Sequence, residues 1–474
     1  MDNRTKLTVQ LSAVQDVYFS YRQQIKTGYK HDDCQFYMPG FWYRRNLRSP
    51  KEAPSFHTSD SWLVREDRLS TPLTAAFSPA NGKSMSVIRI DKFDKEALAT
   101  HKEGEVIVSG ETSIGYTGFE NVGGMTVLSY GFPYREAPKT YIRKLTLAPA
   151  VEAFQSLRKG DSITLTWELA EIDAADFSEC VQRTWEYCYD TNRPQPVDTP
   201  YTVDRMKEVL SNFFVESYVD NTPTHYYSGV ELKTATCDHV DVAEIGFVGR
   251  TLLNAFNALE YGTQQNRQEL MNSANSVFDT YLQNGFSPAG FFNEVVHYNR
   301  GFEESKHSIR RQSEGVYAVL NYLSYEKQQK RKHPEWEKRI KGILDSFLRL
   351  QNEDGSFPRK FKDDFSIVDG TGGSTPSATL PLVMAYKYFK DKRYLESAKR
   401  TVGYLEKELI SKADFFSSTL DANCEDKEAS LYAATATYYL ALVTKGAERT
   451  HYAELSKKAA YFALSWYYLW DVPF

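Results

Sequence analysis

Acidic side chains gather at four places in the second half of the chain, each close to the start of an expected helix. Hydrolysis of a glycosidic bond needs two carboxyl groups, one protonated as the acid and one ionised as base or nucleophile. We predict Glu314 and Asp426 as this catalytic pair, because acids are densest around them and aromatic and basic residues stand beside them. The sequence does not assign the acid and the base between them.

Further polar and aromatic residues are candidate contacts for the substrate. Arg310 and Arg311 could bind the carboxylate of an acidic sugar in bidentate fashion, or they could pair with acids of nearby loops. Trp42 lies in an aromatic stretch that could cover the mouth of the site or form a domain interface. The candidate contacts are Arg310, Arg311, His307, Trp42, Asp369, Glu244 and Glu428.

Each candidate acid at a helix start also has an ordinary structural role open to it. Aspartate and glutamate in the first turn accept hydrogen bonds from free backbone amides and favour the positive end of the helix dipole. Asp241 and Glu244 have the spacing of a capping box, and Asp426 and Glu428 flank another helix start. Both a capping role and a catalytic role therefore stay open for these residues.

The second half of the chain has a helical period throughout. We expect a helix over 203–218 and then four pairs, over 241–260 with 264–283, 313–329 with 334–351, 376–390 with 392–409, and 428–444 with 449–469. Connections are short within a pair and long between pairs, over 285–312, 352–375 and 410–427. In antiparallel hairpins the long loops share one end, so the helix N-termini and these loops predict a pocket there.

The first half of the chain has strand signals and turn residues between them. Short β-branched or aromatic runs occur over 84–90, 105–109, 125–130, 141–147 and 162–167, and a short helix is possible within the first thirty residues. We expect an antiparallel β-sandwich domain over 1–173, a bridging helix and proline-rich linker over 174–200, and a toroid of α/α hairpins over 201–474.

Three motifs carry a resemblance to known enzymes. The stretch from Gln351 to Phe357 looks like the helix-end signature of α/α toroid proteins. Arg310-Arg311-Gln312 is similar to the Arg-Gly-Gln helix-start motif of unsaturated glucuronyl hydrolases, and Cys424 to Ser430 resembles the Asp-Lys-Glu motif of other six-hairpin glycosidases. The resemblance implies a multidomain β + α glycoside hydrolase with an (α/α)6-type toroid after a β-sandwich, with a uronidase as one candidate.

The match to glucuronyl hydrolases departs at two positions. Arg311 stands where their motif has glycine, and Glu314 stands where tryptophan is usual, so their catalytic residues are not carried over. A closed ring of six hairpins contains twelve helices, and nine are expected here, so the ring is expected to fall short of closure.

Two other functions stay open beside hydrolysis of a plant- or microbe-derived oligosaccharide or polysaccharide. One is a polysaccharide lyase that acts by β-elimination on uronates, for which the stretch from His297 to Arg300 offers a base and a neutralising cation. The other is a carbohydrate-binding toroid without catalysis.

Composition excludes some partners and leaves others open. The net charge is -5 with interspersed signs, which argues against a nucleic-acid surface, and no run approaches the roughly 18 apolar residues of a membrane span. Five cysteines show no metal-binding spacing, so we expect neither a metal nor a cofactor. The start lacks an apolar signal core, which fits a cytoplasmic protein, or a periplasmic or secreted one whose signal was removed. The oligomeric state stays open.

Overall fold

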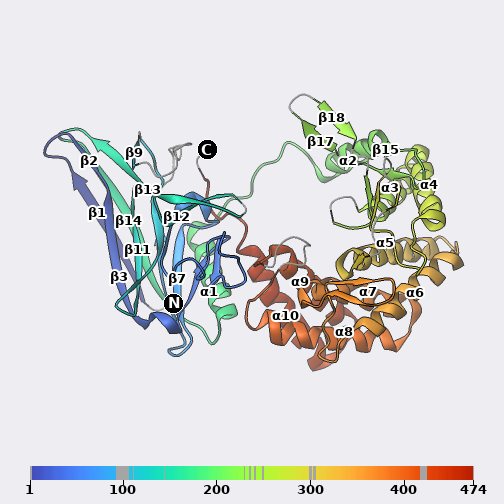
Figure 1. The fold of residues 1–474 in the computed structure, drawn as a ribbon. Helices are drawn as coiled ribbons and strands as arrows, with labels where there is room; N and C mark the ends of the chain where they lie inside the picture. The colour runs from blue at the N-terminus through green and yellow to red at the C-terminus, as the bar shows by residue number, and fades with distance from the viewer. Residues whose placement is uncertain are drawn as a thin grey trace.

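The chain combines a β-rich part and a helical part (Figure 1). The structure is a computed structural model, and it describes residues 3–91, 106–109, 111–143, 145–228, 230–233, 236–239, 242–247, 250–297, 301–302, 306–416 and 424–472.

Two sheets form the β-rich part. The six-stranded sheet has the order β1 (Asn3–Ser12), β14 (Ser162–Asp173), β8 (Lys83–Arg89), β7 (Leu73–Ser78), β4 (Gln35–Met38) and β5 (Trp42–Arg44). The other has the order β2 (Val17–Phe19), β13 (Thr146–Leu157), β12 (Arg135–Arg143), β6 (Trp62–Arg65), β10 (Tyr116–Val122), β11 (Met125–Phe132) and β3 (Tyr21–Lys30), with β9 (Val106–Ser109) parallel to β13. The other strand pairs of the two sheets, among the described residues, are antiparallel.

The expected short helix within the first thirty residues is wrong. Residues 3–12 pair with β14 over their whole length, from Asn3 opposite Glu171 to Ser12 opposite Ser162. Leu7, Val9 and Leu11 all pack against one buried cluster, and this spacing of two is the period of a strand.

That buried cluster joins the two sheets and contains Trp42. The Trp42 ring lies 5.8 Å from Trp62 and 5.1 Å from Phe119, between centroids, and Trp42 is 0% exposed. Its indole N–H donates to the backbone oxygen of Arg44 at 3.0 Å. The prediction that Trp42 contacts a substrate is therefore wrong, because its large apolar surface fills the core between the sheets.

Nine helices of the described helical part follow the β-rich part and the helix α1 (Phe177–Asn192). They are α2 (Val203–Ser217), α3 (Thr251–Gln265), α4 (Gln268–Asn284), α5 (Ile309–Gln328), α6 (Pro334–Leu350), α7 (Thr375–Phe389), α8 (Lys392–Tyr404), α9 (Lys427–Val443) and α10 (Gly446–Leu464). A π-helical turn, Leu405–Ile410, extends α8, and 3₁₀ turns lie at His31–Asp33, Glu66–Arg68 and Gly372–Ser374.

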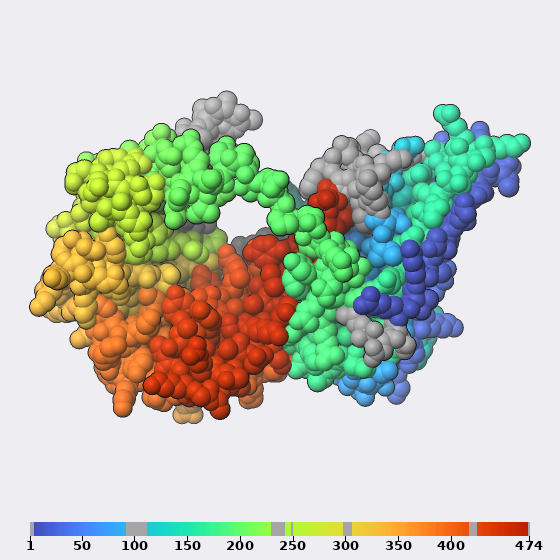
Figure 2. Space-filling view, turned by 180° about the vertical axis from the view of Figure 1, so that it is seen from behind, coloured from blue at the N-terminus to red at the C-terminus, as the bar shows by residue number. Residues whose placement is uncertain are grey.

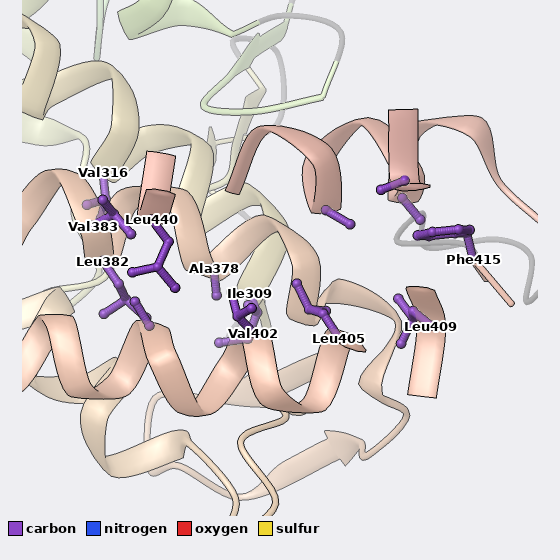
Figure 3. Packing of buried hydrophobic residues seen from close by; sticks show 14 of the residues in the cluster. Ile309, Val316, Ala378, Leu382, Val383, Val402, Leu405, Leu409, Phe415 and Leu440 are labelled. Atoms are coloured by element: carbon purple, nitrogen blue, oxygen red, sulfur yellow. The ribbon is translucent and has the colours of Figure 1, made fainter. Parts of the chain in front are cut away.

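Four helical hairpins follow one another along this part. In each hairpin the two helices pack together, and α3, α5, α7 and α9 also contact one another in that order, as an inner row. Apolar side chains fill the space between the two rows, with Val316 of α5, Leu382 of α7, Val402 of α8 and Leu440 of α9 among them (Figure 3). Small residues such as Ala378 let inner helices approach closely, which explains the alanine-rich sequences of these helices.

Short strands decorate the loops that lead into the inner helices. They are β15 (Tyr218–Val219), β16 (Tyr226–Tyr227), β17 (Val230–Lys233), β18 (Thr236–His239), β19 (Val242–Glu244), β20 (Val295–His297), β21 (Gly301–Phe302), β22 (Lys306–Ser308), β23 (Lys360–Lys362) and β24 (Ile367–Asp369). The helix expected over 241–260 thus begins only at Thr251, because β19 pairs with β20 in extended conformation instead.

The β-rich and helical parts are joined by α1 and by the C-terminal segment. Helix α1 packs on both β14 and α10. The Tyr43 hydroxyl lies 2.6 Å from the Ser465 hydroxyl, the Tyr43 ring stacks on Trp466 at 5.3 Å, and the Leu469 amide donates to the Ser70 oxygen at 2.9 Å. The aromatic run at the end of the described chain is therefore docked on the β-rich part.

A buried glutamate in the β-rich part gives a testable pH dependence of stability. Glu66 is 0% exposed; its carboxylate accepts from the Gly115 amide at 2.7 Å and lies 3.3 Å from Arg89. Burial raises the pKa of Glu66 from 4.5 to about 7, although Arg89 opposes this shift.

The free energy of unfolding should fall as the pH rises from 4.5 to about 7. Between pH 4.5 and about 7 the folded chain keeps a proton that the unfolded chain releases, which costs about 3 kcal/mol by pH 7. We expect Glu66→Gln to remove this part of the pH dependence. The check is urea unfolding of both proteins at several pH values; equal slopes against pH would contradict it.

Candidate active site

A cavity of about 260 Å³ lies at the N-terminal halves of the four inner helices. Each of α3, α5, α7 and α9 contributes to its wall. The cavity thus lies at the end of the hairpins where the sequence predicts a pocket. The wall is formed by Ile245, Arg250, Leu253, Ser313, Glu314, Tyr317, Ser377, Leu380, Pro381, Glu428, Leu431, Tyr432 and Thr435.

Local capping explains why the two glutamates of the wall stand where they do. Ser308 caps α5 by accepting from the Arg311 amide, so Glu314 falls in the second turn of that helix. Asp426 caps α9 by accepting from the Glu428 amide at 2.8 Å, so Glu428 falls in the first turn. Both carboxylates are thereby fixed on regular helices rather than on loops.

Glu314 is held by donors on both oxygens. Its Oε1 accepts from Arg310 Nε at 3.1 Å and from the Tyr432 hydroxyl, and Oε2 accepts from the backbone amide of Phe247. Arg250 Nη2 lies 3.9 Å from Oε1, and only 10% of the Glu314 side chain is exposed. The carboxylate is thus oriented from three separate segments of the chain.

Arg310 connects the two glutamates of the wall. Its Nη2 donates to Glu428 Oε2 at 2.7 Å while Nε donates to Glu314, and the residue is 3% exposed. The guanidinium lies over the rings of Phe247 and Tyr432, at 5.1 and 5.5 Å from their centroids. Burial opposes its charge, but Tyr432 and the two glutamates outweigh burial and raise the pKa of Arg310.

Tyr432 is the phenol of the site. Burial, and then the neighbouring charge of Glu314, raise the pKa of Tyr432 well above that of a free tyrosine, while Arg310 and Arg250 oppose the shift. The hydroxyl therefore keeps its proton and donates it in a hydrogen bond to Glu314.

The structure separates the predicted site residues into two groups. Glu314 and Glu428 line the cavity, with Arg310 bound to both. Arg311 lies beside this group and pairs with Glu244, Nη2 to Oε1, at 3.5 Å. Arg311 thus pairs with an acid of the loop that leads into α3, one of the two interpretations that the sequence leaves open, whereas the partners of Arg310 are acids on the helices α5 and α9.

The other predicted residues lie outside the residues that line the cavity. Asp426 acts as the N-cap of α9. His307 is 1% exposed and lies 2.7 Å from Asp363, where burial lowers its pKa against the opposing effect of that acid. Asp369 accepts from the amide and hydroxyl of Thr371 within its own loop.

Two segments considered from the sequence fall partly outside the described residues. They are the stretch from His297 to Arg300, of which 298–300 are not described, and the long connection 410–427 before α9, of which 417–423 are not described.

Tyr432, Phe247 and Arg250 were missed by reasoning from the sequence. Tyr432 follows Glu428 by four positions on the same helix, one turn away, so it could have been placed on the same face. Phe247 and Arg250 fall in a segment that was read as helix interior, and no signal in the sequence reveals the sharp turn there. Both have positive φ angles, of 65° and 39°.

A glycine next to Glu314 gives a prediction for the geometry of the site. A Cβ on Gly246 would lie 2.5 Å from Glu314 Oε2 and 3.1 Å from the Cα of Arg311. Gly246→Ala should therefore displace the carboxylate and lower kcat by about tenfold or more, because reacting groups tolerate little misplacement.

The matched control is Gly342→Ala in α6, where a Cβ meets nothing within 4 Å. Steady-state kinetics and urea unfolding of both variants make the check. The expectation fails if Gly246→Ala keeps the kcat of the control.

Other kinds of site have no counterpart in the part of the chain that the structure describes. Within these ranges, no group of three or more histidine, cysteine, aspartate or glutamate residues could hold a metal ion. None of the described helices is long and apolar enough to cross a membrane.

No protein-family model and no curated protein sequence matches the chain. Solved structures that resemble it include the unsaturated glucuronyl hydrolase of a Bacillus species (16% identity, 45% of this chain and 60% of that chain, TM-score 0.35). The cellobiose 2-epimerase of Bacillus thermoamylovorans gives 13% identity, 60% and 71% coverage, and a TM-score of 0.41. A GH76 alpha-mannanase of Bacteroides thetaiotaomicron gives 9% identity, 60% and 72% coverage, and a TM-score of 0.40.

The chain spans 60% of the length of the glucuronyl hydrolase that it matches. Unsaturated glucuronyl hydrolase is also the enzyme whose helix-start motif Arg310-Arg311-Gln312 resembles. All three TM-scores are below 0.5.

Proposed function

We propose that the chain is a glycosidase whose two carboxyl groups are Glu314 and Glu428. The observation that carries this proposal is that one buried guanidinium, that of Arg310, binds both carboxylates at the wall of one cavity. A shared guanidinium holds two carboxyl groups close together, as the pair that flanks a glycosidic bond must be. Glu428 takes the place of Asp426, which caps the helix instead.

The two glutamates differ in surroundings, and this difference suggests their roles. Glu314 is enclosed and accepts hydrogen bonds from a guanidinium, a phenol and a backbone amide, which suits the ionised base or nucleophile. Glu428 has 42% of its side chain exposed and accepts one hydrogen bond from Arg310, so substrate and solvent can reach it. We propose that Glu428 acts on the leaving oxygen.

The rest of the wall suits one sugar ring. Leu253, Leu380, Pro381 and Leu431 offer apolar surface, and hydroxyl and carboxylate groups supply the polar contacts. The described charges at the wall balance, because Arg250 and Arg310 face Glu314 and Glu428. A neutral sugar therefore fits the cavity better than a uronate, whose carboxylate would compete with the two glutamates for the same arginines.

A lyase acting on uronates is the second candidate, and the position of Tyr432 favours it. Tyr432 lies beside two arginines, a grouping of a proton-transferring phenol with cations that can neutralise a carboxylate. The raised pKa of Tyr432 argues against its acting as a base in the unliganded protein.

The test is the class of product formed from a panel of neutral and uronate glycosides. Hydrolysis releases reducing ends without ultraviolet absorption, whereas β-elimination gives unsaturated products that absorb. Reducing ends from a neutral glycoside support the proposal, and unsaturated products from uronates would replace it with the lyase. Binding without turnover on the whole panel would support a carbohydrate-binding protein instead.

A further inference from the structure

A loop of the β-rich part binds the connection that leads into α9. Arg48 binds Asp414 with two hydrogen bonds, Nε to Oδ1 and Nη2 to Oδ2, both of 2.7 Å. Arg44, the last residue of β5, reaches Asp414 Oδ2 with its Nη1 at 3.3 Å. The Arg48 guanidinium also lies 3.9 Å from the centroid of the Phe416 ring. Bidentate pairs combined with ring stacking fix an arginine in one orientation.

Asp414 and Phe416, the residues that Arg48 contacts, are connected directly to the start of α9. The Asp426 amide donates to the Phe415 oxygen at 2.7 Å, and Phe416 forms an antiparallel bridge with Glu425. The two ends of this connection therefore lie side by side, and what holds residues 414–416 also holds residues 425 and 426.

The path continues from this point to the cavity. Asp426 accepts from the Glu428 amide at 2.8 Å, and Glu428 Oε2 accepts from Arg310 at 2.7 Å. Each step is a hydrogen bond or a pair of them, so a shift of Asp414 would move the first turn of α9. The β-rich part thus influences the position of Glu428, although it supplies none of the residues that line the cavity.

A partly buried acid beside Asp414 adds to the dependence on Arg48. Burial, and then the charge of Asp414, raise the pKa of Glu425 well above its ordinary value, against Arg48 and Arg44. Burial opposes the charge of Asp414 itself, but Arg48 and Arg44 outweigh burial and lower the pKa of Asp414, so the arginines favour its ionised form. Without Arg48 this charge would lose its bidentate partner at a buried position.

We propose that Arg48 is a positioning residue, which acts from the β-rich part through Asp414 and Phe416 to hold Glu428 at the cavity. Its kinetic consequence rests on the proposed glycosidase function, whereas its structural consequence does not. A contact that merely joined the two parts would stabilise the protein without affecting the order of α9 or the work of Glu428.

The test compares Arg48→Ala and Arg48→Lys with Arg22→Ala in the full chain. Arg22 is the matched control, since its Nη2 also donates to both carboxylate oxygens of an acid, those of Glu120 at 2.9 and 2.8 Å, within the β-rich part. We expect backbone amides of 427–436 to exchange hydrogen about tenfold faster in Arg48→Ala, less so in Arg48→Lys, and unchanged in Arg22→Ala. Unchanged exchange in Arg48→Ala overturns the proposal.

Kinetics then separate positioning from simple stabilisation. With a hydrolysed substrate, Arg48→Ala should lower kcat by about tenfold with little change in KM, and add almost nothing to Glu428→Gln, because both act on one group. Full additivity in the double variant overturns the proposal. Faster exchange without hydrolysis of any glycoside would leave the positioning role standing and reject only the glycosidase function.

Discussion

Glu314→Gln and Glu428→Gln each lower kcat by at least about a hundredfold on a neutral glycoside, because losing a general acid or base normally costs that much. The substitution keeps the shape of the side chain, and the amide oxygen still accepts a hydrogen bond from Arg310. What is lost is the ionisable carboxyl group of each residue. Steady-state kinetics measure the effect, and urea unfolding confirms that each variant is folded.

Asp426→Asn is the control that decides between the two possible pairs. Asparagine caps a helix as well as aspartate does, so α9 should keep its start and Glu428 its place. We expect kcat to stay within about threefold of the wild type, since Asp426 does not line the cavity. A hundredfold loss in Asp426→Asn with little effect of Glu428→Gln would restore the pair expected from the sequence.

The hairpins could be predicted because their signals are local. His333-Pro334 marks the start of α6, and the period of 3.6 persists through each helix, so the predicted ends of α6 lie within one residue of the observed ones. The segment before α3 could not be predicted in this way. Its residues 242–244 are extended only because β20 pairs with them from more than fifty positions away.

The site was predicted in part for similar reasons. Glu314 and Arg310 stand one turn apart on an inner helix, so their meeting follows from the helical period alone. The preference for Asp426 over Glu428 had no basis in the local sequence, because the direction of a first-turn side chain depends on the capping geometry. Trp42 could not be placed either, since its burial depends on Trp62 and Phe119, which belong to the other sheet.

Arg310→Met lowers the free energy of unfolding by about 3 kcal/mol or more, because removal of one partner leaves a buried charge uncompensated. Arg310 is 3% exposed, and Glu314, with 10% of its side chain exposed, loses its closest charged partner. Urea unfolding measures the change. Arg339→Met in α6 is the control, since the Arg339 guanidinium also lies over an aromatic ring, that of Phe286 at 4.8 Å, and forms no ion pair with an acid among the described residues.

The cause of this loss can be separated from the loss of packing by neutralising the acids as well. In Arg310→Met combined with Glu314→Gln and Glu428→Gln neither acid is left charged without a partner, and Arg250, with 42% of its side chain exposed, is solvated. Much of the stability should therefore return, because neutral replacement of a whole buried pair costs little. If the triple variant is less stable than Arg310→Met, the arginine stabilises the site through its contacts with Phe247 and Tyr432 rather than by balancing the two carboxylates. Recovery of stability without recovery of kcat would show that the charges at this cavity are kept for chemistry and at a cost to the fold.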